Sequence, residues 1–243
     1  MHRFYIAPNE WNPDALVLTG SEAHHARNVL RLAEGDKVVL FNGRGREITA
    51  AVTGTASRTV ALRKLHESAT PLLRCRITLA QAIPKGKNMD LIVQKAVEIG
   101  ASEIAPILSD RTIVRLDEDD VAQKQAKWQT VAIEAAKQCG QNWLPQVAPP
   151  CTLAQFFAER PKFDLQLIGS LQSDTLHLKQ VLSAYGNRPE SVLMLIGPEG
   201  DFTPAELNLA RSHGCRPITL GPIILRVETA AIYCLSVLSY ELL

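Results

Sequence analysis

Two loops rich in glycine and proline carry the residues that could do chemistry. The first is Leu195–Phe202 (LIGPEGDF) and the second is Leu220–Thr229 (LGPIILRVET). Each is expected to follow a strand and to precede a helix, and in parallel α/β sheets ligands bind at the carboxyl ends of the strands. Glycine allows the backbone to approach a ligand closely, and proline stiffens the loop. A single loop of this kind would be interpreted as a tight turn, but two of them, one carrying Arg226, Glu228 and Thr229, favour a ligand site.

An arginine and a glutamate two positions apart are the candidate catalytic residues. The guanidinium of Arg226 is always cationic and offers several donors, so it can stabilise negative charge that develops during a reaction. The carboxylate of Glu228 can accept a proton or orient Arg226. The residues alone leave an alternative open, which is a structural salt bridge at the start of a helix, where glutamate is favoured in any case.

The composition and the motifs that the sequence lacks narrow the class of protein. The 243 residues are 46% hydrophobic and 21% charged, as in an ordinary globular protein with a buried core. Lysine and arginine together number 26 against 25 acidic residues, so the total charge identifies no partner. No G-x-G-x-x-G follows the first strand and there is no G-x-x-x-x-G-K-[ST], which argues against a Rossmann dinucleotide site and a P-loop. The histidines show no metal-binding spacing, so no metal is expected.

The cysteines and the hydropathy pattern indicate a cytoplasmic protein. The five cysteines are odd in number and no pair has C-x-x-C spacing, so neither a disulfide framework nor a zinc site is indicated. The N-terminus lacks the apolar core of a signal peptide. The most apolar stretch, Leu220–Tyr240, is interrupted by Arg226 and Glu228, so no membrane span is expected.

The elements that must position the two loops form two groups. The first seventy residues predict a small β-barrel-like module with one helix, Glu22–Leu32, capped by Ser21 and followed by Gly35. Its expected strands are Val38–Phe41 and Glu47–Val52, joined by an Asn-Gly hairpin, and Val60–Leu65. A domain boundary is expected near Ser68–Leu73.

From Cys75 onward, strands alternate with helices, which predicts a parallel and buried sheet. Thr203-Pro204-Ala205-Glu206 has an N-cap threonine, a proline at the first helical position and a capping-box glutamate, so it marks a helix start. The expected strands are Arg76–Ala82, Glu103–Leu108, Asp164–Gly169, Ser191–Ile196 and Arg216–Leu220. The other expected helices are Asn88–Ile99 (ended by Gly100), Asp117–Cys139, Thr175–Ala184 and Glu228–Leu242.

Both loops resemble the SPOUT signature of the 16S rRNA (uracil(1498)-N(3))-methyltransferase family. The matching residues are Ile196–Phe202, Leu220–Pro222 and Leu225–Ala230. Further segments that resemble this family are His25 with Val29–Arg31, Lys85–Lys87 with Met89, Lys95, Glu98 and Gly100, and Glu134–Ala136 with Gln138–Gly140. The match spans nearly the whole chain. Two departures are Asp201, where many relatives have a second glycine, and Gln141, where an arginine is common.

The resemblance implies a fold, a reaction and partners. It implies a PUA-like RNA-binding β-barrel domain over residues 1–70 and a SPOUT (α/β-knot) methyltransferase domain with a C-terminal deep trefoil knot over residues 74–243. It further implies transfer of a methyl group from S-adenosyl-L-methionine to N3 of uridine 1498 of 16S rRNA within the 30S subunit, by a homodimer. The rival interpretations are a catalytically silent RNA-binding or ribosome-assembly factor on this fold, and a SPOUT enzyme that acts on tRNA or on a ribose 2′-hydroxyl.

The resemblance also assigns candidate site residues besides Arg226 and Glu228. The candidate cofactor-binding residues are Gly169, Leu171, Gly197, Glu199, Gly200, Leu220, Gly221, Ile224, Leu225, Val227 and Thr229. Residues 1–74 hold ten Lys/Arg and seven Asp/Glu, a basic bias that fits a nucleic-acid surface but equally an ordinary solvated face. The candidate RNA-binding residues are Arg3, His25, Arg27, Arg31, Lys85, Lys87 and Arg111.

Overall fold

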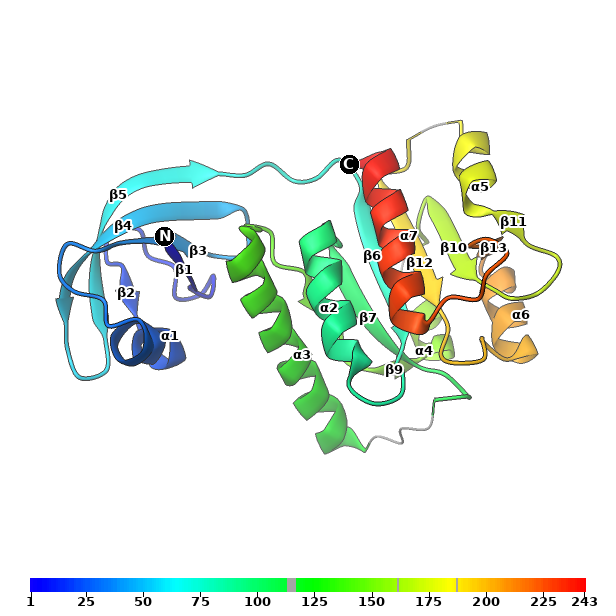
Figure 1. Ribbon diagram of the computed structural model, residues 1–243, viewed down its shortest axis with the longest axis horizontal. Coiled ribbons are helices and arrows are strands. Elements are labelled where there is room, and N and C mark those ends of the chain that lie inside the picture. The colour runs from blue at the N-terminus through cyan, green and yellow to red at the C-terminus, as the bar shows by residue number, and fades with distance from the viewer. Residues whose placement is uncertain (113–116, 161, 187) are drawn as a thin grey trace. The chain divides into compact units, whose positions relative to one another are not determined.

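A computed structural model describes residues 1–112, 117–160, 162–186 and 188–243 (Figure 1). The chain divides into two compact units. Unit 1 consists of Met1–Leu72 and Ile133–Leu144, and unit 2 of Leu73–Ala132 and Pro145–Leu243. The long helix α3 (Glu118–Cys139) therefore belongs in part to each unit.

Unit 1, all of whose residues are described, is built on a five-stranded sheet in the order β1-β3-β4-β5-β2. The β1·β3 pair is parallel and the other pairs are antiparallel, with two register shifts between the long strands β4 and β5. Alternate residues of the strands point inward, which buries Phe4, Leu40 and Ile48 in one apolar core. The strands are β1 His2–Tyr5, β2 Val17–Leu18, β3 Lys37–Phe41, β4 Arg46–Thr55 and β5 Val60–Ala69.

The predicted hairpin at Asn42-Gly43 is confirmed. The side-chain Oδ1 of Asn42 accepts the backbone N–H groups of Arg44 (2.8 Å) and Arg46 (3.1 Å), so the asparagine holds the turn between β3 and β4. Gly43 and Gly45 both have positive φ angles. Gly45 also lies directly under Trp143, which leaves no room for a side chain at that position.

The single predicted helix of unit 1 was wrong in its form. The helix α1 (Gly20–His24) begins two residues earlier than a cap at Ser21 predicts, and it continues as a short π-helix, η1 (His25–Val29), instead of running to Leu32. Arg31 adopts a left-handed conformation with φ 54°, and the N–H of Leu32 bonds back to the carbonyl of Ala26. This backbone bond between residues six apart closes the helix before Gly35 is reached.

Unit 2 is a mixed α/β unit with a parallel sheet, as predicted. Within the described residues the sheet has eight strands, in the order β11-β13-β10-β12-β6-β7-β8, with β9 on β7. The bounds are β6 Arg76–Ala82, β7 Glu103–Leu108, β8 Gln146–Val147, β9 Cys151–Thr152, β10 Leu165–Gly169, β11 Leu176–His177, β12 Ser191–Ile196 and β13 Arg216–Thr219.

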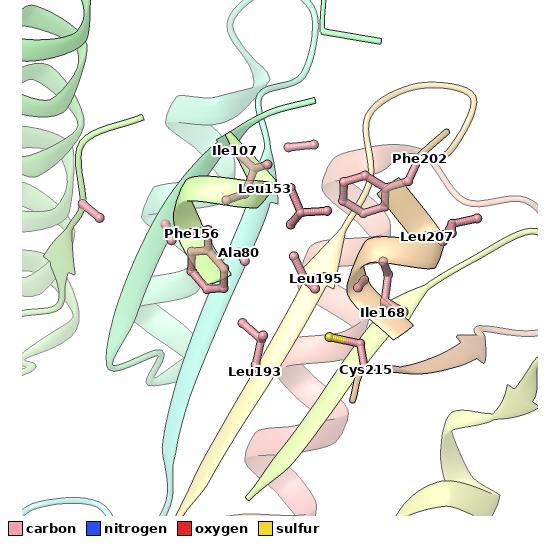
Figure 2. Close-up of a cluster of buried hydrophobic side chains, with 14 residues drawn as sticks. Ala80, Ile107, Leu153, Phe156, Ile168, Leu193, Leu195, Phe202, Leu207 and Cys215 are labelled. Atoms are coloured by element: carbon pink, nitrogen blue, oxygen red, sulfur yellow. The ribbon is translucent and has the colours of Figure 1, made fainter. Parts of the chain in front are cut away.

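The helices of unit 2 cover both faces of this sheet. Helices α2 and α7 pack side by side, and α7 also packs on β6 and β12 (Figure 1). On the other face Leu193 and Leu195 of β12 meet Phe156 of α4 and Leu207 of α6, with Phe202 closing one end of the cluster (Figure 2). The helices are α2 Asn88–Ile99, α4 Leu153–Glu159, α5 Leu178–Ala184, α6 Pro204–Ser212 and α7 Val227–Leu242.

Candidate functional site

A pocket opens where three strands of unit 2 end. It has a volume of about 290 Å³ and lies against the loops that follow β10, β12 and β13 and the first turn of α7. Because these strands are parallel, their carboxyl ends meet at one edge of the sheet, where α/β folds bind ligands. The lining residues are 169–171, 196–201, 219–221, 223–227 and 230.

Glycine is favoured at several positions of these loops, for different physical reasons. A Cβ on Gly197 would lie 3.2 Å from both the ring and the backbone nitrogen of Phe202, so a side chain there would crowd the sharp turn after β12. Gly200 and Gly221 have φ angles of 84° and 127°, a region that side-chain-bearing residues avoid. Nothing lies within 4 Å of the position of a Cβ on Gly221, so its backbone is open to a ligand on that side.

Two acidic side chains tie the loop after β12 to neighbouring loops. The carboxylate of Glu199 accepts the backbone N–H of Lys85 (3.1 Å), which follows β6. The carboxylate of Asp201 accepts the backbone N–H of Leu171 (2.8 Å) and the hydroxyl of Ser170 (3.4 Å), both after β10. The pocket walls are therefore joined by hydrogen bonds as well as by packing.

The capping-box glutamate Glu206 has a second role that its motif did not predict. Its carboxylate caps α6 through the N–H (2.8 Å) and hydroxyl (3.0 Å) of Thr203. The same carboxylate accepts the hydroxyl of Ser109 (3.2 Å) and the N–H of Asp110 (3.0 Å), in the segment after β7. The side chain is only 6% exposed, and four donors satisfy its charge.

A smaller cavity of about 150 Å³ shares Glu199 with the pocket. The exposed cations Lys85 and Arg111 lie on it, and the guanidinium of Arg111 donates to the carbonyl of Gly200. Positive charge therefore lies next to the pocket, as an anionic ligand would require. Its remaining lining residues are Ile83, Pro84, Gly86 and Thr112.

The two candidate catalytic residues lie on the same turn but have different surroundings. Arg226 is the N-cap residue of α7, is exposed, and lines the pocket. Glu228 is not among the lining residues, and its carboxylate accepts a hydrogen bond from the side-chain amide of Asn88 (3.2 Å) at the start of α2. No ion pair joins Arg226 to Glu228 in the part of the chain that is described. No contact therefore supports a structural salt bridge between them, or direct orientation of Arg226 by Glu228.

The structure brings ten of the eleven candidate cofactor-binding residues onto this one pocket. The exception is Thr229, which does not line it and is exposed on α7. Sequence reasoning had no functional role for Asp201, although its departure from glycine in the resemblance was a signal. The residues that line the pocket as expected are Gly169, Leu171, Gly197, Glu199, Gly200, Leu220, Gly221, Ile224, Leu225 and Val227.

The candidate RNA-binding residues of unit 1 fall into two kinds. Arg3 is largely buried, with a side chain 14% exposed, and its guanidinium pairs with Glu47 at 2.6 Å, so its charge is already compensated. His25 and Arg27 are half-buried and Arg31 is exposed, all in the α1–η1 segment or directly after it. In unit 2, Lys87 is exposed beside Lys85, immediately before α2.

The described residues lack two features that would indicate other kinds of site. No helix there is both long and apolar enough to cross a membrane. In that same part of the chain, no group of three or more histidine, cysteine, aspartate or glutamate side chains is placed to hold a metal ion.

Comparison with known proteins gives two family matches and several relatives. A family model described as "RNA methyltransferase domain" matches residues 71–239, and one described as "RNA methyltransferase PUA domain" matches residues 18–65. The chain is 32% identical over 238 residues to "Ribosomal RNA small subunit methyltransferase E" of Synechocystis sp., covering 94% of this chain and 74% of that protein. It is 30% identical over 229 residues to the protein of the same name from Bacillus subtilis, covering 92% and 89%.

A solved structure agrees over almost the full length of both chains. It is the Ribosomal RNA small subunit methyltransferase E of Neisseria gonorrhoeae bound to S-adenosyl methionine. The TM-score is 0.87 at 32% identity, and the alignment covers 99% of this chain and 97% of that chain.

Proposed function

Because the chain belongs to the RNA methyltransferase family whose domain matches residues 71–239, we propose that it transfers a methyl group from S-adenosyl-L-methionine to N3 of uridine 1498 of 16S rRNA in the assembled small ribosomal subunit. The observation that carries the proposal is the pocket at the carboxyl ends of β10, β12 and β13, where ten candidate cofactor residues converge. The named relatives act on small-subunit rRNA, and one is bound to S-adenosyl methionine. We place this reaction in the cytoplasm.

The residues of the pocket fit such a cofactor. Ile224, Leu225 and Val227 offer apolar surface for a flat adenine ring, while the open space beside Gly221 lets a ligand approach the backbone closely. Ile224 is 75% exposed in this structure, which leaves it available to cover a ring. When bound, the cofactor supplies a methyl group on a sulfonium, which a nucleophile attacks in line.

Arg226 is the residue we assign to charge stabilisation. Loss of the N3 proton leaves negative charge shared over the O2 and O4 atoms of uracil. The guanidinium keeps its charge at every relevant pH, and it lines the pocket where the methyl group would be presented. Arg226 is the N-cap residue of α7, so the helix that follows also fixes its backbone.

Glu228 is the candidate proton acceptor. Its bond from Asn88 fixes the carboxylate in the first turn of α7, next to the start of α2, which directly follows Lys85 and Lys87. A carboxylate held there can accept the N3 proton from a base that enters from the cationic side, directly or through one water.

We propose that RNA contacts come from both units. Lys85, Lys87 and Arg111 would bind phosphates near the target base, which must be unpaired or flipped out for its N3 to be reached. In unit 1, residues 1–70 would form the PUA-like RNA-binding domain. His25, Arg27 and Arg31 would be the side chains of this domain that contact RNA. Arg3 would contribute less, since Glu47 already neutralises it.

Two further features are proposed for unit 2. Residues 74–243 would form the SPOUT domain with a deep trefoil knot, in keeping with the return of α7 from β13 to pack on β6 and β12. A homodimer would bury apolar side chains that are exposed here, among them Ile223 (75% exposed) and Tyr240 (88%).

The test is methyl transfer to purified 30S subunits and to free 16S rRNA, with labelled cofactor and mass mapping of the product. We expect one base methyl group at uridine 1498, on 30S subunits only. We expect Arg226→Ala to lose at least about a hundredfold in rate, as for removal of a group that stabilises transition-state charge, with cofactor binding retained. Arg216→Ala, an exposed arginine on β13 away from the lining, is the control.

Other products would overturn the assignment in distinct ways. Cofactor binding absent from the wild-type protein would favour a silent RNA-binding or assembly factor. A methyl group on tRNA or on a ribose 2′-hydroxyl would favour a different SPOUT activity. Wild-type turnover by Arg226→Ala and Glu228→Gln would remove both residues from the mechanism.

A further inference from the structure

Asp201 adopts a backbone conformation that is uncommon for a residue with a side chain. Its φ angle is 73°, and among the described residues only Arg31 shares a positive φ without being glycine. Such a conformation persists only where the surroundings stabilise it, and it is frequent at ligand sites. The carboxylate at this strained position therefore needs its own explanation.

Both oxygens of the Asp201 carboxylate are engaged. One accepts the backbone N–H of Leu171 at 2.8 Å and the hydroxyl of Ser170 at 3.4 Å. The other accepts the N–H of Phe202 at 2.8 Å. The side chain thus spans from the loop after β12 to the loop after β10, and all but Phe202 line the pocket.

This side chain attaches the loop after β10 to the loop after β12, whereas the backbone N–H of Ser170 anchors the same loop to the carbonyl of Ile218 (3.0 Å) on β13. In the described part of the chain, the hydrogen bonds that join residues 169–172 to the loop after β12 are the two that Asp201 accepts. Ser170 in turn holds the next part of the loop, because its hydroxyl accepts the N–H of Gln172 at 3.2 Å. Leu171 itself is 58% exposed, so burial does not hold it in place.

The other side of the same turn is also fixed. The guanidinium of Arg111 donates to the carbonyl of Gly200 and, at 3.4 Å, to that of Asp201. The left-handed residue is therefore held through its carbonyl from one side and through its carboxylate from the other. A fixed turn can transmit a fixed position to the loop after β10.

We infer that Asp201 is a positioning residue that holds the loop of residues 169–172 as a preformed wall of the cofactor pocket. The inference rests on the proposed function for the identity of the cofactor. One consequence is that the N–H of Leu171 is occupied by Asp201 and is not available as a donor to the cofactor. Leu171 then contributes its side chain and the loop its remaining backbone groups, at a reduced entropic cost of binding.

Asp201→Gly separates positioning from folding. Glycine adopts the left-handed conformation without strain, which offsets part of the stability lost with the hydrogen bonds of the carboxylate, so the midpoint of thermal unfolding is expected to change little. The carboxylate is lost, so the affinity for S-adenosylmethionine by calorimetry is expected to fall about tenfold, the effect of one charge-assisted hydrogen bond. Asp201→Asn tolerates the same φ and keeps one acceptor for Leu171, so its affinity is expected to lie between the two.

The control is Asp174→Gly, an aspartate in the segment after the same loop. It pairs with Arg211 at 2.6 Å and does not line the pocket, so the affinity for S-adenosylmethionine is expected to equal that of the wild type. Amide exchange of Leu171, followed by NMR without any ligand, is expected to accelerate in Asp201→Gly and to stay unchanged in Asp174→Gly.

The outcomes distinguish this inference from the proposed function. Wild-type affinity together with wild-type exchange at Leu171 in Asp201→Gly would overturn the inference. So would a fall in affinity that only parallels a fall in stability, since Asp201 would then be a folding residue. A wild-type protein that does not bind S-adenosylmethionine would refute the proposed function, and the exchange of Leu171 would still decide whether Asp201 holds the loop.

Discussion

Glu206→Gln tests how much of the functional edge of the sheet depends on one buried carboxylate. One oxygen of Glu206 accepts the N–H and hydroxyl of Thr203 and the hydroxyl of Ser109, and the other accepts the N–H of Asp110. An amide replaces one oxygen by an NH₂ donor. The less damaging orientation keeps the three bonds and places the NH₂ group against the N–H of Asp110.

The magnitude follows from that single lost contact. A hydrogen bond to a charged group contributes about 1.5–3 kcal/mol, and the N–H left facing another donor adds to the loss. We expect a decrease of about 2–3 kcal/mol in the free energy of unfolding, which lowers the melting temperature by about 5–10 °C in a protein of this size. Loss of the helix cap is not part of this figure, because the box at α4 already uses glutamine, with Thr152 and Gln155.

The assay is thermal unfolding followed by circular dichroism, together with amide exchange of Asp110. Glu206→Gln should melt at lower temperature, and the amide of Asp110 should exchange faster. Gln155→Glu, the reverse change in the capping box of α4, is the matched control and should melt within error of the wild type. A wild-type melting temperature in Glu206→Gln, with unchanged exchange at Asp110, would refute the role given to this carboxylate.

Three further predictions concern other parts of the molecule. Gly45→Ala should destabilise unit 1 by about 3 kcal/mol or more in urea unfolding, because φ is 80° and a Cβ would lie 2.6 Å from the Trp143 ring. Gly54→Ala, where a Cβ would meet open space, should leave the stability nearly unchanged. Equal stabilities of the two variants would contradict this prediction. Burial raises the pKa of the Cys215 thiol from 9.0 to about 12, so its contribution to stability is intact below pH 9 and is lost as the pH rises toward 12. When the free energy of unfolding is measured in urea at several pH values, it should fall less steeply above pH 9 in Cys215→Ala than in the wild type. The same slope in both proteins would argue against this effect of the Cys215 thiol. Cys139 is exposed, so a thiol reagent at neutral pH should react rapidly with it, and Cys139→Ser should remove that fast phase.

The elements that the sequence predicted with the structure's own bounds are those whose signals are local. The buried parallel strands Arg76–Ala82, Glu103–Leu108 and Ser191–Ile196 are mainly apolar, and Asn88–Ile99 ends at the left-handed Gly100. Such patterns depend on neighbours in the chain, so they can be read without knowing the topology.

Other elements were missed for physical reasons. The two-residue strands β2, β8, β9 and β11 are too short to show a periodicity. The helix Leu153–Glu159 was missed although Thr152 and Gln155 form a capping box that could have marked it. The π-helical segment His25–Val29 depends on packing and on a bond across six residues, which no period of 3.6 predicts.

The contacts within the site could not be predicted at all. The bonds from Glu199 to Lys85 and from Asp201 to Leu171 join segments that are far apart in the chain. They exist because β10, β12 and β6 are neighbours in the sheet, an order that the sequence pattern does not reveal. The residue types of the site were therefore predictable, and their pairing was not.

The central claim is that the loops after β10, β12 and β13 together bind S-adenosylmethionine. The most direct test is a titration of the isotope-labelled protein with S-adenosylmethionine, followed by amide chemical shifts. We expect saturable shifts at Gly197, Gly200 and Gly221, with the amides near the aromatic pair Phe157 and His213 unchanged. Absence of saturable shifts, or shifts centred on Phe157 and His213, would contradict it.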